Sequence, residues 1–119
     1  MQRDWGSTAE TVAAIGALVD AHPELLSVLE EHLVDNGGEV LPHLVMADVI
    51  RWLVVNEHAR PEVCRSVLAW MEHRFRVGPE SVRGMIAVSG VEMIPDPGQP
   101  GSGLRTLLGA SLRSADPWQ

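Results

Sequence analysis

Five histidines are the residues of this chain best suited to hold a metal or move a proton, and three of them follow a glutamate directly: Glu31-His32, Glu57-His58 and Glu72-His73. Adjacent residues of a helix point about 100° apart, so such a dipeptide does not offer two ligands to one ion. Helical zinc sites use histidines four residues apart, and no two histidines here have that spacing. We therefore predict no metal site, with these histidines on the surface or at helix ends.

Other motifs of catalysis or cofactor binding each lack a required residue. The acidic stretch from Asp35 begins like a calcium loop, but its twelfth position is Met46 and not a bidentate glutamate. Residues 101–103 read Gly-Ser-Gly but follow a proline-rich loop and not a strand, so they are no dinucleotide fingerprint. Ser89 lacks the first glycine of a nucleophile elbow, because Ala87 stands there. We expect no enzyme and no cofactor.

The cysteine and the tryptophans are expected to pack. Cys64 lies on an apolar helix stripe with no neighbouring base, which indicates a buried structural thiol. Trp52 and Trp70 lie within predicted helices and are expected in the core. Trp5 and Trp118 lie near the two ends, where either can cover the core or mark a contact surface.

Asp48 and Arg51 are the only polar residues between positions 44 and 55. They lie three residues apart, so in a helix they share one side and are expected to pair. A helix that is apolar nearly all round is usually buried, which predicts a structural ion pair that is at least partly buried. The alternative is that this pair, with nearby histidines, lines a pocket for a small ligand or a reaction.

The acidity of the chain is concentrated in one region. The net charge is −7, and residues 20–62 alone carry nine acidic residues against two arginines. This balance disfavours nucleic acid and favours a basic protein partner, although an acidic surface also serves solubility. We call Glu30, Glu31, Asp35 and Glu39 the acidic face, and we expect them to form one patch. His43, at the end of the segment 39–43, completes the predicted binding edge.

Four evenly spaced prolines predict the elements that position these residues. Pro23, Pro42, Pro61 and Pro79 are separated by 19, 19 and 18 residues, and each precedes an apolar-rich run. Proline suits the first turn of a helix, so the chain is predicted to be all-α. We expect five to six short helices in a layered bundle that resembles a short array of helical hairpins.

The helix limits follow from capping and turn residues. The first helix is expected to open with a capping box at residues 7–10 and to stop before His22. The second is expected to bury Leu25, Leu26, Leu29 and Leu33. In the fourth, from Pro61, Glu72 is expected to face out and pair with Arg76.

The C-terminal third is less regular. The fifth helix is predicted from Pro79 to about residue 92, although residues 82–94 also fit a short buried strand. A Pro/Gly-rich loop is expected over 95–103, then a short last helix with Leu104, Leu107, Leu108 and Leu112 on its inner side. Residues 114–119 are expected to form a tail that stays mobile unless Trp118 docks.

The composition of the chain is typical of a single folded globular domain. At 119 residues with 45% hydrophobic residues, it suits one folded domain over 1–119. A single cysteine gives no reason for an oxidising compartment, and no secretion signal or membrane span is recognised. A cytoplasmic protein is expected, and its use of arginine for all nine basic residues suggests a GC-rich bacterial genome.

One stretch of the chain reads Gly38-Glu39-Val40-Leu41-Pro42-His43-Leu44-Val45-Met46-Ala47-Asp48 and is followed by Arg51-Trp52-Leu53. It resembles small helical bacterial proteins, many of them uncharacterised and some presumed to be toxin-immunity proteins. Residues 88–92 and 107–109 resemble later parts of that pattern, so the similarity covers about Leu29 to Leu112. The chain departs from it at Gly90, where the related sequences carry a larger residue. The resemblance implies a helical protein that neutralises a cognate toxin.

Three functions are therefore open. The leading prediction is a non-enzymatic module that binds a basic protein, possibly a toxin, through the acidic face and His43. The alternatives are a ligand-binding or enzymatic domain around Asp48 and Arg51, and a homo-oligomer whose fourth or last helix pairs with itself.

Overall fold

Every one of the four spaced prolines begins, or directly precedes, a helical segment in the computed structural model, which describes residues 8–118. No strand occurs among these residues, so the all-α prediction is confirmed. The helical segments, with η marking the 3₁₀ and π segments, are α1 (Ala9–Ala21), η1 (Pro23–Leu25), α2 (Leu26–Asp35), α3 (Pro42–Val55), α4 (Pro61–Val77), α5 (Glu80–Met85), η2 (Ile86–Gly90), η3 (Val91–Met93), η4 (Ser102–Leu107) and α6 (Ala110–Arg113).

The segment for which helix and strand were both open is helical throughout. α5 continues into a π turn, η2, and then into the 3₁₀ turn η3, so the backbone remains helical from Glu80 to Met93. The π turn contains Gly90, where an added Cβ would lie 2.7 Å from Cε of Met71. A larger residue at this position would require the end of the Met71 side chain to move.

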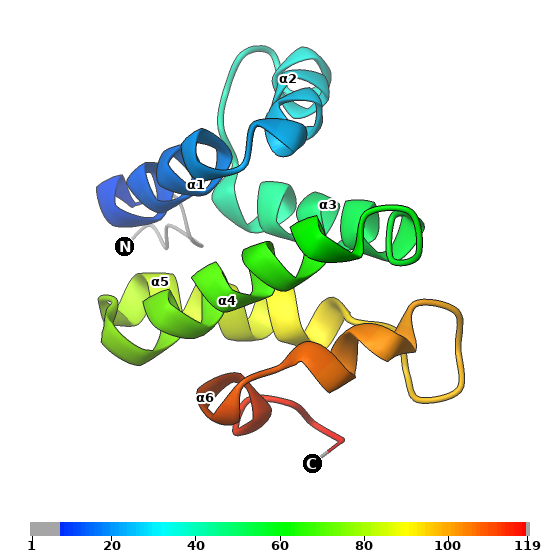
Figure 1. The fold of residues 1–119 in the computed structure, drawn as a ribbon. Coiled ribbons are helices and arrows are strands. Elements are labelled where there is room, and N and C mark those ends of the chain that lie inside the picture. The colour runs from blue at the N-terminus through cyan, green and yellow to red at the C-terminus, as the bar shows by residue number, and fades with distance from the viewer. Residues whose placement is uncertain (1–7, 119) are drawn as a thin grey trace.

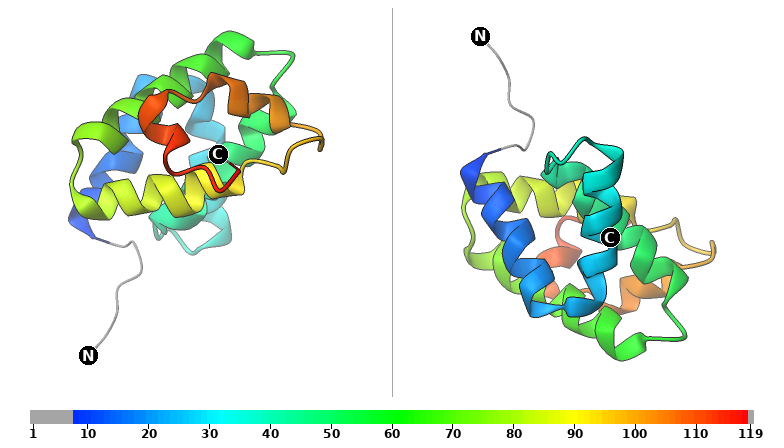
Figure 2. Two further views of the ribbon diagram at one scale, coloured as in Figure 1. Left: turned by 90° about the horizontal axis from the view of Figure 1, so that it is seen from below. Right: turned by 90° about the horizontal axis from the view of Figure 1, so that it is seen from above.

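Helix α3 lies at the centre of the arrangement. Figure 1 shows α1 and α2 above α3, α4 crossing in front, α5 with its continuation behind, and α6 below. The two views of Figure 2 show the same layers from below and above, and α3 contacts α1, α2, η2 and η4. The side chains between these layers form one continuous apolar core that includes Ile15, Leu25, Ile50, Leu68, Ile86 and Leu104.

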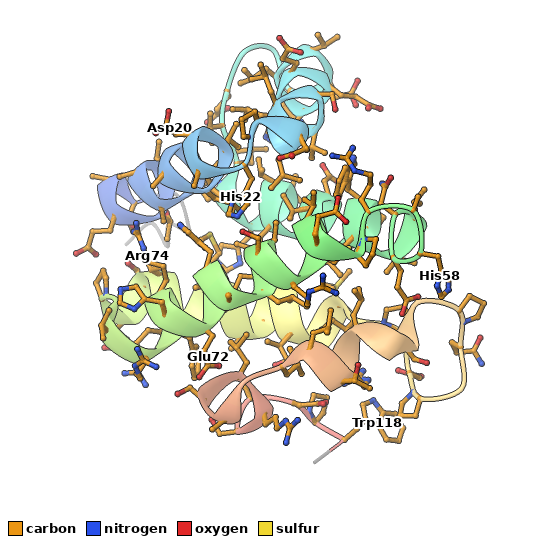
Figure 3. All side chains as sticks on the ribbon, viewed as in Figure 1. Asp20, His22, His58, Glu72, Arg74 and Trp118 are labelled. Carbon is orange, nitrogen blue, oxygen red and sulfur yellow. The ribbon has the colours of Figure 1, made fainter. Side chains whose placement is uncertain are left out.

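Two histidines lie at helix ends, one of the two predicted locations, but both are buried: His22 caps the end of α1 and His32 lies in the last turn of α2. His22 is 6% exposed and His32 is 3% exposed. The His22 ring lies below α1 and points toward α4 (Figure 3). Its Nδ1 lies 2.9 Å from the carbonyl oxygen of Leu18, and its Nε2 lies 2.9 Å from Oγ of Ser66. His22 thus ties the end of α1 to α4.

The capping box of α1 and the buried side of α2 both differ from the prediction. Thr8 caps α1, with Thr11 as its reciprocal partner, so the box is one residue later than predicted; Ser7 lies outside the described residues. In α2, Leu26 is 48% exposed, which corrects its expected burial, and the inner side is formed by the buried His32 with the partly buried Val28 and Leu29.

The C-terminal segment is anchored, which corrects the prediction of a mobile tail for its described part. Asp116 is 5% exposed and forms an ion pair with Arg105. Glu72 was expected to face out and pair with Arg76; the charge of Arg76 does act on it, but its carboxylate accepts hydrogen bonds from the backbone N–H groups of Ser111 at 3.0 Å and Leu112 at 2.9 Å. Figure 3 shows Glu72 directed from α4 toward α6, while Trp118 is 57% exposed.

No single helix within residues 8–118 has the length and apolar character needed to cross a membrane. The helices Ala9–Ala21 and Pro23–Asp35 have that length and character only when they are taken together, and they are bent by 115° relative to each other.

Candidate functional site

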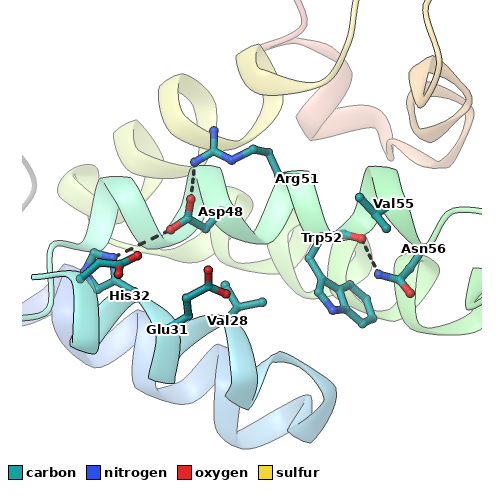
Figure 4. Close-up of a pocket in the computed structure, with 9 residues that line it drawn as sticks. Val28, Glu31, His32, Asp48, Arg51, Trp52, Val55 and Asn56 are labelled. Atoms are coloured by element: carbon teal, nitrogen blue, oxygen red, sulfur yellow. Dashed lines mark hydrogen bonds and ion pairs between the residues drawn. The ribbon is translucent and has the colours of Figure 1, made fainter.

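A groove of about 330 Å³ opens between α2 and α3, on the acidic region of the chain (Figure 4). It is lined by apolar, acidic and aromatic side chains together, and both helices contribute. The residues that line it are Val28, Glu31, His32, Asp35, Asp48, Arg51, Trp52, Val55 and Asn56. We call this feature the α2–α3 groove.

The turn between the two helices brings their polar residues together. Gly37 and Gly38 have φ values of +63° and +85°, which glycine adopts without strain, and they let the chain reverse after α2. The backbone N–H of Leu41 then donates to Nε2 of His32 at 3.0 Å. The other ring nitrogen, Nδ1, lies 3.3 Å from Nδ2 of Asn36 and 3.9 Å from Oδ2 of Asp48.

Asp48 and Arg51 pair, but they do so at the surface. Arg51 donates to Oδ1 of Asp48, while the Arg51 side chain is 63% exposed and that of Asp48 is 34% exposed. The predicted pairing is present and Asp48 is partly buried, but Arg51 is exposed, so the pair is less buried than predicted. α3 is also less buried than predicted, because Leu44 is 51% and Val55 81% exposed. The apolar run 44–55 led to the wrong inference because α3 has one open side, toward the groove.

The groove carries an excess of negative charge. Arg51 neutralises Asp48, and among residues 8–118 no cation forms an ion pair with Glu31 or Asp35. These two acids lie four residues apart on α2, so they share one side of that helix. In Figure 4, Glu31 extends from α2 toward α3, and the half-buried Trp52 ring lies farther along the groove.

The remaining residues of the predicted binding edge lie outside this groove. Glu30 and Glu39 are exposed but do not line it. His43 is half-buried, and its Nδ1 lies 2.6 Å from Oγ of Ser89 in η2. Burial lowers the pKa of His43, which favours its neutral form. His43 thus joins α3 to η2, and only Glu31 and Asp35 of the acidic face meet Asp48 and Arg51.

Cys64 is completely buried, as predicted for a structural thiol. Its Sγ lies 3.6 Å from the carbonyl oxygen of Leu53. Burial, with the nearby carboxylates of Glu57 and Glu62, raises the pKa of this thiol above its ordinary value of 9.0. Within the described part of the chain, no three His, Cys, Asp or Glu side chains gather as ligands for one ion.

Sequence reasoning missed Trp52 and His32 as parts of this site. His32 follows Val28 by four residues and Leu29 by three, so it shares their side of α2, and this spacing was the available signal. Trp52 follows Asp48 by four residues, which places both on the groove side of α3. Comparisons of the chain with protein-family models, curated proteins and solved structures found no match.

Proposed function

We propose that this protein is a non-enzymatic binding module that clamps a basic protein partner, as an immunity protein clamps its toxin. Its binding surface consists of the acidic face and the adjoining α2–α3 groove. The observation that carries the proposal is that Glu31 and Asp35, with no cationic partner in the described chain, border a groove that also holds Trp52. A partner with a positive patch gains attraction at long range and a pocket at contact.

The composition of the groove suits a protein interface. Apolar area from Val28, Val55 and Trp52 provides contact, while the carboxylates form a polar rim. Val55 is 81% exposed although it is a large aliphatic residue on the central helix, and cover by a partner would remove it from water. The resemblance of residues 38–53 to presumed immunity proteins supports the same class of function.

The groove also favours the alternative of a small-ligand site, because Asp48, Arg51 and His32 all line it. A volume of about 330 Å³ lies at the small end of the range for ligand pockets. A ligand of this kind would be recognised without a protein partner. Equilibrium dialysis against small cations and anions distinguishes this alternative from protein binding.

Affinity capture from the native host, with mass spectrometry of the bound proteins, tests the proposal. The bait is the wild-type chain, beside a double variant Glu31→Arg with Asp35→Arg and a control Glu80→Arg with Glu92→Arg. Both variants raise the net charge by four, but only the first pair lies at the groove. We expect one basic protein to bind the wild type and the control and to be lost with the groove variant.

Two outcomes contradict the proposal. A partner that binds all three baits equally does not use this face. A protein that binds no host protein but retains a small molecule belongs to the alternative class.

A further inference from the structure

We infer that the α2–α3 groove binds the guanidinium group of an arginine side chain that the basic partner presents. This inference rests on the proposed function and names the contact at its centre. The steps below concern the charge of the groove, its aromatic wall and the arginine that already lies at its edge.

The net negative charge of the residues that line the groove favours a cationic ligand. Three carboxylates line it, and the one arginine among its lining residues pairs with Asp48, which leaves Glu31 and Asp35 without an ion-pair partner in residues 8–118. His32 adds no charge while its Nε2 accepts from Leu41. An incoming cation thus meets two uncompensated carboxylates on α2 and an already engaged carboxylate on α3.

Trp52 makes a planar cation the better fit. A guanidinium stacks on an indole face and keeps its N–H groups free to donate to carboxylates at the edge, whereas an ammonium is a compact, strongly hydrated charge. The same chain contains such a contact, since the guanidinium of Arg74 lies 4.7 Å from the ring centre of Trp70. A groove of about 330 Å³ accommodates one such side chain.

Arg51 occupies part of this site in the free protein. Its guanidinium binds Asp48, yet its side chain remains 63% exposed, so little packing holds it there. An incoming guanidinium competes with Arg51 for Asp48 and is repelled by its charge. Removal of the Arg51 charge is therefore expected to tighten binding, which no purely structural role of the Asp48–Arg51 pair predicts.

The test uses the full chain and short capped peptides, Gly-Arg-Gly, Gly-Lys-Gly and Gly-citrulline-Gly, with methylguanidinium as a free guanidinium compound of the same charge as the arginine peptide. Binding at low salt is followed by the NMR shift of the indole N–H of Trp52, identified by its loss in Trp52→Leu. Citrulline keeps the shape of arginine without its charge. We expect the arginine peptide to bind with a dissociation constant of about 1–10 mM, as one exposed contact allows, and the citrulline peptide not to bind.

The variants give the matched comparison. Glu31→Gln is expected to weaken the arginine peptide about 3- to 10-fold, and Arg51→Gln to strengthen it about 3-fold. Glu92→Gln, an exposed acid outside the groove, is expected to change nothing. Trp52→Leu, checked for folding by circular dichroism, is expected to abolish binding that is followed through backbone amides of α2.

Several results would overturn the inference. These are equal binding of the citrulline or lysine peptide, no effect of Glu31→Gln, and tighter binding of methylguanidinium than of the peptide, which would indicate a free small cation. The inference can fail while the proposed function holds. If host capture depends on Glu31 and Asp35 while the arginine peptide does not bind, the partner uses the acidic face without this contact.

Discussion

The guanidinium of Arg105 holds three parts of the C-terminal region at once. It pairs with Asp116 and donates to the carbonyl oxygens of Pro95 at 3.1 Å and Ile94 at 2.9 Å. The side chain of Asp116 is completely buried, and that of Arg105 is 12% exposed. This is the buried pair of the described chain, whereas Asp48 and Arg51 pair at the surface.

The two ion pairs predict different costs for the loss of one carboxylate. Asp116→Ala leaves Arg105 charged in the interior and is expected to lower the free energy of unfolding by about 3 kcal/mol. Asp48→Ala removes an exposed partner and is expected to cost less than about 1 kcal/mol. Urea unfolding of both variants beside the wild type measures the difference. Equal losses would mean that burial of the pair does not set its contribution.

Glu72 gives the stability of the protein a component that depends on pH. Burial raises the pKa of the Glu72 carboxyl, but hydrogen bonds from the backbone N–H groups of Leu112 and Ser111 outweigh it and hold the pKa below 4.5. The folded protein therefore binds this proton less tightly than the unfolded chain. The stabilisation is complete above pH 4.5 and is lost as the pH falls through the lower pKa of the folded state.

Glu72→Gln is expected to lower the free energy of unfolding by about 1–2 kcal/mol at neutral pH, because two charge-assisted hydrogen bonds weaken. The difference from the wild type should shrink as the carboxyl becomes protonated in acid. Urea unfolding from pH 7 to pH 3 measures it, with Glu80→Gln as the exposed control. A difference that stays constant with pH would show that the charge of Glu72 contributes nothing.

At the scale of elements, the end of α4 depends on a glycine. A Cβ on Gly78 would lie 2.4 Å from the carbonyl oxygen of Arg74, a backbone atom that cannot move independently. Gly78→Ala is therefore expected to cost about 1–3 kcal/mol. Gly84→Ala in α5 is the control, because a Cβ there meets nothing within 4 Å and alanine favours a helix by about 0.5–1 kcal/mol. Thermal unfolding should move in opposite directions for the two variants.

The helix starts were predictable because proline constrains its own backbone, and α3 and α4 do begin at Pro42 and Pro61. The sides that helices bury were less predictable. Leu26 was expected inside but is 48% exposed, and the fully buried position of α2 is occupied by the polar His32, which apolar spacing alone does not identify. The roles of Glu72 and Asp116 depend on contacts across 40 and 11 residues, which local spacing does not encode.

The candidate site was predictable only where its residues are close in the sequence. Glu31 with Asp35, and Asp48 with Arg51, are local helix pairs that the sequence reveals. That these pairs face one another across a groove depends on how α2 packs on α3, and this follows from the turn at Gly37 and Gly38 and from the bond of His32 to Leu41. His43 was expected beside the acidic residues, but its contact with Ser89 is set by the packing of η2.

At the scale of the whole molecule, the negative charge is concentrated in the segment of the chain that forms the groove. Residues 20–62, which include α2 and α3, contribute the whole net charge of −7, and residues 63–119 carry a slight positive balance. We propose that this concentration of charge attracts a basic protein from a distance and orients it before contact. An acidic surface that serves only solubility does not require its charge to be concentrated in one region.

The association rate with the captured partner as a function of salt tests this account most directly. Stopped-flow mixing compares the wild type with the Glu31→Arg, Asp35→Arg double variant at ionic strengths from about 0.02 M to 0.5 M, across the range where the Debye length falls below about 10 Å. We predict that the wild-type rate falls at least about 10-fold over this range and that the double variant is slow throughout, with an unchanged melting temperature. A rate that responds neither to salt nor to charge reversal would contradict the acidic-face mechanism.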